Sequence, residues 1–178
     1  MLATLYNTAI RAGNPSEDRG LLGMRVENLH LDQHMVEVKD KGGQWWLVYG
    51  LTDHTIHLIE DYLNERDQIA DFKEGHLWIN ERTYPLRQGQ LNAIIKEAGR
   101  KAGIKRKKLT SKMFRKTFVK HALESGMRPI SLIGTGKTVK TCFCVGWTGQ
   151  KAIDTVMTFY APQLLAQIEK DREKFEWA

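Results

Sequence analysis

The chain has 178 residues and a mass of 20.5 kDa, enough for one domain with a substantial core. Its 42% hydrophobic and 27% charged residues exclude a disordered chain, and its apolar runs fall short of the roughly 18–20 residues that a membrane-spanning helix needs. The formal net charge of +6 favours a polyanionic partner such as nucleic acid.

The first 51 residues are predicted to contain a helix and a small sheet. The stretch 1–13 has the pattern of the end of a helix, and the Pro, Gly and Asx residues of 14–20 indicate a polar loop. Alternating apolar residues over 21–51 indicate three short antiparallel strands, with a hairpin turn at 39–44.

Helical periodicity dominates the rest of the chain. A helix with Thr52 as its N-cap is predicted over 52–70. Beyond it, an extended piece is predicted over 76–80, and helices over 86–102, over 109–123 and from about 152 onward. The predicted fold class is therefore α+β, mostly helical, with a small three-stranded antiparallel sheet.

The helix predicted over 109–123 concentrates positive charge near its N-terminus, where Thr110 or Ser111 is the expected cap. At 100° per residue, Phe114 and Phe118 fall on one side. The cations expected on the opposite side are Lys112, Arg115, Lys116 and Lys120. Because a helix N-terminus is already positive, either this is a solvated basic face or an external phosphate binds there.

Two other residues have side chains suited to phosphate chemistry, each with a plain structural alternative. Lys41 lies at the hairpin tip beside two glycines, where an ammonium is either solvated or reaches a phosphate or a leaving oxygen. Tyr160 lies near the end of a helical run, either as a half-buried core residue or as a nucleophile whose phenolate is stabilised by positive charge.

A glycine-rich stretch over 131–138, SLIGTGKT, resembles the end of a phosphate-binding P-loop. Ser131 stands where that motif has its first glycine, and no acidic second strand follows. Nucleotide hydrolysis is therefore the least favoured functional hypothesis.

The cysteines, Cys142 and Cys144, alternate along an extended stretch and are not expected to bridge each other. With no other thiols and no signal peptide pattern, a reducing compartment is expected. No His/Cys spacing indicates a metal site, and no cofactor is expected.

Five segments, in their order along the chain, resemble the catalytic domain of tyrosine recombinases, the phage integrase family. They are LYNTAIRAG, LLGMRVENLHLDQHMVEVKDKGGQWWLVYGLTD, LTSKMFRKTFVKHALESGM, VGWTG and VMTFYA. The catalytic residues that this resemblance implies are Arg11, Lys41, Lys112, Arg115, Trp147 and Tyr160. The implied chemistry is DNA cleavage and rejoining through a 3′-phosphotyrosyl link, without a metal.

The resemblance also implies a role for each side chain. Arg11 and Arg115 bind the non-bridging oxygens of the scissile phosphate, Tyr160 attacks phosphorus, and Lys41 protonates the departing 5′-oxygen. Lys112 stands where the family usually has histidine. The segment 14–18 is an insertion that leaves Glu17 or Asp18 to replace the family's acid and makes Arg19 an alternative to Arg11. A longer step before Trp147 makes Lys137 an alternative at the third phosphate position.

Further expectations concern the whole molecule. The chain is expected to form a single catalytic domain over 1–178, without the family's N-terminal core-binding domain. It is expected to bind double-stranded DNA, to self-associate on it as a tetrameric synapse, and to act in the cytoplasm or nucleoid of a host cell, as an atypical member from a virus or other mobile element. The expected DNA-binding residues are Lys105, Arg106, Lys107, Lys108, Lys116 and Lys120. The competing hypothesis is a DNA-binding module of integrase ancestry that does not cut.

Overall fold

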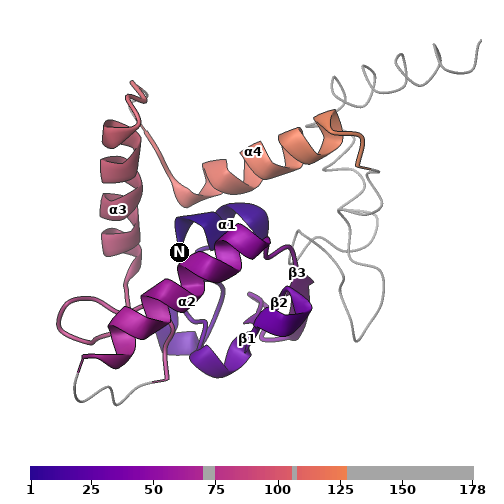
Figure 1. Cartoon of the computed structure of the whole chain (residues 1–178). Coiled ribbons are helices and arrows are strands. Elements are labelled where there is room, and N and C mark those ends of the chain that lie inside the picture. The colour runs from indigo at the N-terminus through magenta and orange to yellow at the C-terminus, as the bar shows by residue number, and fades with distance from the viewer. Residues whose placement is uncertain (70–74, 106–107, 128–178) are drawn as a thin grey trace, which may run out of the picture.

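A three-stranded antiparallel sheet and four α-helices make up the part of the chain that the computed structural model describes, residues 1–69, 75–105 and 108–127 (Figure 1). The helices are α1 (Leu2–Asn7), α2 (Asp53–Asp67), α3 (Gln88–Lys101) and α4 (Ser111–Glu124). Short 3-10 turns occur at Pro15–Glu17, Val26–Asn28 and Leu31–Gln33. The α+β prediction is confirmed.

The sheet has the order β1-β2-β3, with β1 at Leu29–His30, β2 at Met35–Lys39 and β3 at Trp45–Tyr49. Its inner face is formed where Val36 pairs with Val48 and Val38 pairs with Trp46, all of them buried. The register follows from the alternation of apolar residues, because a slip by one residue would turn this face to solvent. The three predicted strands and their hairpin are confirmed.

Helix α2 begins where the sequence predicts, at the Thr52 cap. The Thr52 hydroxyl accepts a hydrogen bond from the Thr55 backbone N–H at 3.2 Å. The end of α1 is tied to the same turn, since Asn7 Nδ2 donates to Thr55 Oγ1 at 2.6 Å. Ile59, fully buried, anchors the α2 stripe in the core.

The core lies between the inner face of the sheet and helices α1, α2 and α3. Its fully buried side chains include Leu5, Ile10, Leu21, Leu22, Met24, Val36, Ile59, Leu77, Trp78 and Leu91. Tyr62 of α2 packs on Trp78 with ring centroids 5.1 Å apart, and its hydroxyl accepts from the Ile79 N–H at 3.1 Å. Burial raises the pKa of Tyr62 above its ordinary value.

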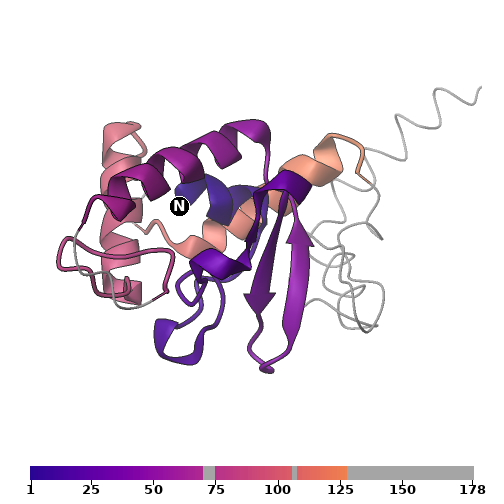
Figure 2. The same ribbon diagram turned by 60° about the horizontal axis from the view of Figure 1, so that its bottom comes forward.

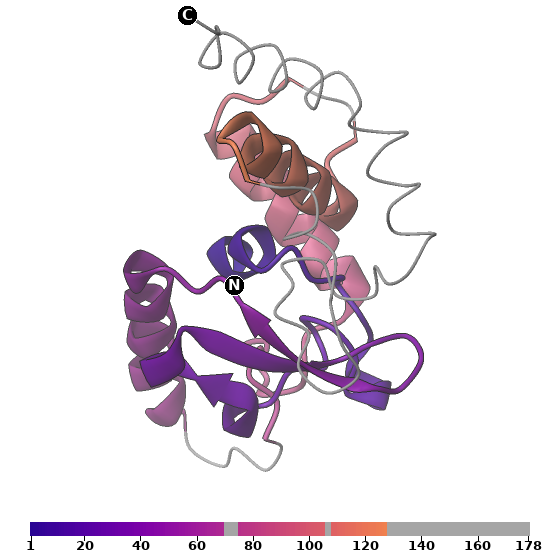
Figure 3. The same ribbon diagram turned by 90° about the vertical axis from the view of Figure 1, so that its right-hand side faces the viewer.

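Helix α4 packs on α1 and touches α3 (Figures 1 and 3). Tyr6 forms the contact with α1: its ring meets Phe118 edge-on at 5.8 Å, and its hydroxyl lies 2.7 Å from His121 Nδ1. Thr110 is the N-cap of α4, one of the two predicted caps, although its side chain makes no capping hydrogen bond. Helix α4 lies where the sequence predicts a helix, but the burial of Arg115 differs from the prediction.

Arg115 corrects the predicted faces of this helix. It is only 9% exposed and belongs to the buried stripe, whereas the sequence pattern placed it on a basic face opposite Phe114 and Phe118. The reason is helical spacing: Val119 lies one turn beyond Arg115, and Ala122 lies seven residues beyond it, so all three face the same way. Lys112, in contrast, is exposed as predicted.

The first helix is shorter than the stretch 1–13 predicted for it. It ends at Asn7, because Ala9 adopts a left-handed conformation with φ 49°. The chain then continues in an irregular segment that carries Arg11. In the described ranges, no helix is long and apolar enough to cross a membrane.

Candidate functional site

The turn that presents Lys41 is organised by the carboxylate of Asp40. Asp40 Oδ1 accepts from the backbone N–H groups of Gly42 at 2.7 Å and Gln44 at 3.1 Å, and Oδ2 accepts from Trp46 Nε1 at 2.8 Å. Asp40 N–H in turn donates to the Gln44 carbonyl at 2.9 Å. The backbone of the turn is thus fixed on the sheet, while the exposed Lys41 side chain makes no hydrogen bond or ion pair with another described residue.

Arg11 projects outward from the segment that follows α1. Its neighbours Ile10 and Ala12 are buried, whereas the Arg11 side chain is exposed. The Arg11 carbonyl accepts from the Leu21 N–H at 2.9 Å, and the Ala12 carbonyl accepts from the Leu22 N–H at 2.8 Å. The backbone is therefore fixed, and the guanidinium has no ion-pair partner in the described part of the chain.

Residues 14–19, which include the predicted insertion 14–18, form a closed loop, hereafter the 14–19 loop. Asn14 and Arg19 exchange both backbone hydrogen bonds, at 2.9 and 3.0 Å. The glycines that flank the loop, Gly13 and Gly20, have φ of 75° and 63°, and a Cβ on Gly20 would lie 2.8 Å from Gly13 Cα. Gly20 N–H then donates to the Lys39 carbonyl at 3.0 Å. The loop is thereby anchored beside the end of β2, and both extend on the same side of the molecule (Figures 2 and 3).

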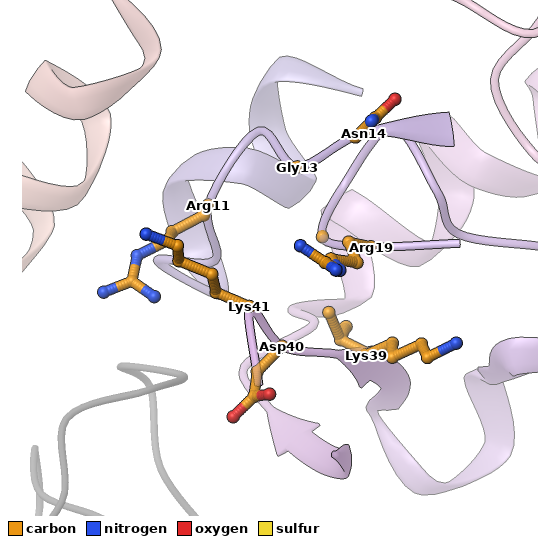
Figure 4. Close-up of a pocket in the computed structure, with 9 residues that line it drawn as sticks. Arg11, Gly13, Asn14, Arg19, Lys39, Asp40 and Lys41 are labelled. Atoms are coloured by element: carbon orange, nitrogen blue, oxygen red, sulfur yellow. The ribbon is translucent and has the colours of Figure 1, made fainter. Parts of the chain in front are cut away.

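These three segments enclose a pocket of about 190 Å³ (Figure 4). Its lining residues are Arg11, Gly13, Asn14, Arg19, Gly20, Val38, Lys39, Asp40 and Lys41. In Figure 4, the Arg11 and Lys41 side chains extend to the same side, whereas Lys39 extends the other way. Lys39 lies over the Trp45 ring, with Nζ 5.8 Å from its centroid. The structure therefore brings the predicted pair Arg11 and Lys41 together at one pocket.

This arrangement suits a phosphate group. The Arg11 guanidinium is a planar fork that matches two phosphate oxygens, and the Lys41 ammonium is a mobile donor on a flexible stem. The pocket's one carboxylate, on Asp40, is turned to the hairpin's own N–H groups. An anion in the pocket would meet two cations that no described carboxylate neutralises.

The carboxylates of the 14–19 loop pair with residues other than Arg11. Glu17 forms an ion pair with Arg19. Asp18 Oδ1 accepts from Arg25 Nε at 3.1 Å and lies 3.4 Å from His76 Nε2. Arg19, the alternative to Arg11, also lines the pocket, so the structure places both arginines there.

The predicted residues of α4 lie apart from this pocket's lining. Lys112, Lys116 and Lys120 recur every fourth residue and form an exposed row, in which Lys120 pairs with Glu124 at 3.5 Å. Lys105 and Lys108, which precede the helix, are also exposed. Arg106, Lys107, Lys137, Trp147 and Tyr160 lie outside the described residues, as do the cysteines and the glycine-rich stretch 131–138.

Sequence reasoning missed two features of the site. The role of Asp40 had a local signal, because an Asp two and three residues before glycines is typical of a turn whose side chain accepts backbone N–H groups. The contact of Asp18 with His76 had none, because the two are far apart in sequence. No group of three or more His, Cys, Asp or Glu residues suited to a metal ion occurs in 1–69, 75–105 and 108–127.

Both a protein-family model and a named relative match this chain. Residues 1–133 match the model of the family described as "Phage integrase family". The chain is 33% identical to a protein named tyrosine recombinase XerD from Chlorobaculum tepidum over 129 residues, which are 71% of this chain and 40% of that relative. The chain therefore spans less than half of that relative's length.

Solved structures share the fold. The crystal structure of the XerA recombinase superposes on this chain with a TM-score of 0.63 at 16% identity. The match covers 99% of this chain and 57% of the XerA chain. The Tn1549 transposon integrase in complex with transposon right end DNA has a TM-score of 0.65 at 16% identity, with coverage of 99% and 58%. The XerH site-specific recombinase bound to its difH substrate has a TM-score of 0.60 at 21% identity, with coverage of 72% and 36%.

Proposed function

The chain belongs to the phage integrase family, and we propose that it catalyses DNA strand cleavage and rejoining in site-specific recombination through a 3′-phosphotyrosyl intermediate. The observation that carries this proposal is the shared pocket of Arg11 and Lys41. Two cations from separate segments converge there, and each is the residue that the family resemblance assigns to the scissile phosphate. The resemblance named the two residues from their sequence segments, and the structure places both in the lining of one pocket.

The proposed step is an in-line displacement at phosphorus. The Tyr160 oxygen attacks the phosphate and loses its proton to water, the bond from phosphorus to the 5′-oxygen breaks, and Lys41 gives a proton to that departing oxygen. Rejoining is the reverse: a 5′-hydroxyl attacks phosphorus and Tyr160 leaves. No oxidant, metal or nucleotide is consumed, because the phosphate ester energy is kept in the phosphotyrosyl bond.

The remaining residues stabilise the charge that develops on the phosphate. Arg11 binds its non-bridging oxygens from the pocket, and Arg115, only 9% exposed on α4, is proposed to do the same. Lys112 takes the place of the family's histidine at the phosphate. Trp147, or Lys137 in its stead, supplies the third contact.

The exposed cations are proposed to bind the duplex beyond the scissile phosphate. In this group we place Lys105, Arg106, Lys107, Lys108, Lys116 and Lys120. Relatives of this fold have been solved with DNA bound, as the XerH and Tn1549 complexes show for those proteins. For this chain we propose a catalytic domain over 1–178 that binds double-stranded DNA, self-associates on it, and acts where the DNA of its host cell lies. A mobile element is the proposed source.

A suicide substrate tests the proposal against a module that binds DNA without cutting it. A nick close to the cleavage site releases a short 5′-hydroxyl strand by diffusion, so a cleaving protein accumulates as a covalent adduct. We expect a denaturant-resistant adduct whose peptide, by mass spectrometry, carries the nucleotide on Tyr160. Tyr160→Phe should bind the same duplex equally well and form none. Normal duplex binding without any adduct in the unaltered chain would instead establish the binding module.

A further inference from the structure

A buried histidine, His76, connects the 14–19 loop to the rest of the domain. It is only 6% exposed. Its Nε2 lies 3.1 Å from the Pro15 carbonyl oxygen and 3.4 Å from Asp18 Oδ1. Since a carbonyl oxygen only accepts, His76 Nε2–H is the donor. The ring thus holds the loop by a hydrogen bond to Pro15 and lies close to the Asp18 carboxylate.

His76 is itself held on a rigid base. It pairs with Arg25 in an antiparallel bridge, and the flanking backbone bonds join Val26 N–H to the Gly75 carbonyl at 2.9 Å and Leu77 N–H to the Met24 carbonyl at 2.8 Å. Arg66 Nη2 donates to the His76 carbonyl at 3.1 Å. The imidazole therefore projects from a fixed part of the core toward the 14–19 loop.

Arg25 completes the contact from the same bridge. Its Nε donates to Asp18 Oδ1 at 3.1 Å, so the Asp18 carboxylate accepts a hydrogen bond from Arg25 and lies 3.4 Å from His76 Nε2. Asp18 adopts a left-handed backbone with φ 49°, which turns its carboxylate back under the loop. The next residue is Arg19, whose side chain lines the pocket with Arg11.

Glu17 restricts Arg19 from the other side. It pairs with the Arg19 guanidinium and accepts from Asn14 Nδ2 at 3.0 Å. Arg19 is thus held by a carboxylate before it and by the backbone turn at Asp18. A guanidinium restricted in this way loses less conformational entropy when it binds a phosphate than a free one does.

We propose that His76 is a positioning residue that, together with Arg25 and through Asp18, holds the 14–19 loop so that Arg19 acts beside Arg11 on the same phosphate. The inference rests on the proposed function for the identity of the anion, a DNA phosphate. It makes Arg19 a second guanidinium of the pocket, where the sequence presented it only as an alternative to Arg11. The 14–19 loop then contributes to binding instead of merely lengthening the turn.

Hydrogen–deuterium exchange tests the positional part without DNA. His76→Leu introduces an apolar side chain that lacks the donor, and His76→Gln places an amide donor near the position of Nε2. We expect the backbone amides of Asn14 and Arg19 to exchange about tenfold faster in His76→Leu, as the loss of the hydrogen bond to Pro15 implies. His76→Gln should restore most of the protection. Unchanged exchange in His76→Leu would overturn the proposal.

Duplex binding as a function of salt tests the second part. Arg19→Gln should lower affinity roughly twofold to fivefold and reduce the log–log salt slope by about 0.9, the value for one phosphate contact. His76→Leu should do nearly the same, and the double variant should lose little more than Arg19→Gln alone. Additive losses, or a salt slope that His76→Leu leaves unchanged, would show a purely structural role and overturn the inference.

A variant from the loop side keeps the test usable where His76→Leu does not fold. Asp18→Gly removes the carboxylate without straining the left-handed backbone at that position, and the same coupling with Arg19→Gln is expected. These readouts do not depend on cleavage. A chain that bound DNA with the expected coupling but formed no adduct would refute the proposed catalysis and leave this inference standing. A chain without salt-dependent duplex binding would refute the inference.

Discussion

Replacing Asp40 with Asn should weaken the fold through one identifiable contact. Asp40 Oδ1 accepts from two backbone N–H groups of the turn, and an amide oxygen can keep that role. The other oxygen accepts from Trp46 Nε1 at 2.8 Å, and in Asn an NH₂ group takes its place. Two donors would then face each other beside a Trp46 side chain that is only 3% exposed.

The magnitude follows from the hydrogen bond that is lost. A hydrogen bond to a charged acceptor contributes about 1.5–3 kcal/mol, and the facing donors add part of a desolvation penalty of about 1–3 kcal/mol. The turn is partly exposed, so we expect the lower end, about 2 kcal/mol of unfolding free energy. Asp40→Ala removes all three acceptor contacts and should cost about 3 kcal/mol.

Urea unfolding of a double-mutant cycle isolates the contact. The single variants are Asp40→Asn and Trp46→Phe, and the second removes the indole N–H. In the Trp46→Phe background, Asp40→Asn should cost no more than about 0.5 kcal/mol, because the opposing donor is gone. An equal cost of Asp40→Asn in both backgrounds would refute the assigned role of Oδ2. Unchanged stability in all variants would refute the account of the turn.

Substitutions at three other positions give further predictions. Gly20→Ala should destabilise the fold by about 2 kcal/mol or more, because φ is 63° and a Cβ would lie 2.6 Å from the Arg11 carbonyl oxygen; thermal unfolding measures this. Tyr62→Phe should cost about 1 kcal/mol by removing the acceptor of Ile79 N–H. Because burial raises the pKa of Tyr62, this hydroxyl loses its proton at a lower pH in the unfolded chain than in the folded chain. The unaltered chain should therefore lose stability above pH 10 more steeply than Tyr62→Phe in pH-dependent urea melts. Lys112→Ala should stabilise α4 by a few tenths of a kcal/mol yet slow adduct formation, and Lys112→His should restore part of the rate; identical single-turnover rates for the three would contradict a role at the phosphate.

Elements set by local patterns could be predicted from the sequence. The Thr52 cap and the apolar stripe that follows it determine α2, and alternating residues around Gly42 and Gly43 determine the hairpin. The convergence of Arg11 with Lys41 was predictable only through the family resemblance. The two residues are far apart in sequence, and no local pattern indicates that they line one pocket.

Features that depend on tertiary contacts were not predictable. Arg115 lies at helical spacing from Val119 and Ala122, but which face of α4 is buried follows from how the helix packs on α1. The pattern of 1–13 continued past Asn7, yet the left-handed turn at Ala9 ends the helix there. The contact of Asp18 with His76 depends on the bridge between Arg25 and His76, which no sequence period encodes.

The central claim is that Lys41 and Arg11 act on one phosphate in different ways. Single-turnover cleavage of a suicide substrate, made with either oxygen or sulfur at the 5′-bridging position, separates the roles. A thiolate departs without a proton, so Lys41→Ala should cleave the oxygen substrate about 100-fold to 10,000-fold more slowly than the unaltered chain and the sulfur substrate at nearly the unaltered rate. Arg11→Ala should be slow on both, because its target is the non-bridging oxygens. Equal slowing of Lys41→Ala on the two substrates would contradict the account.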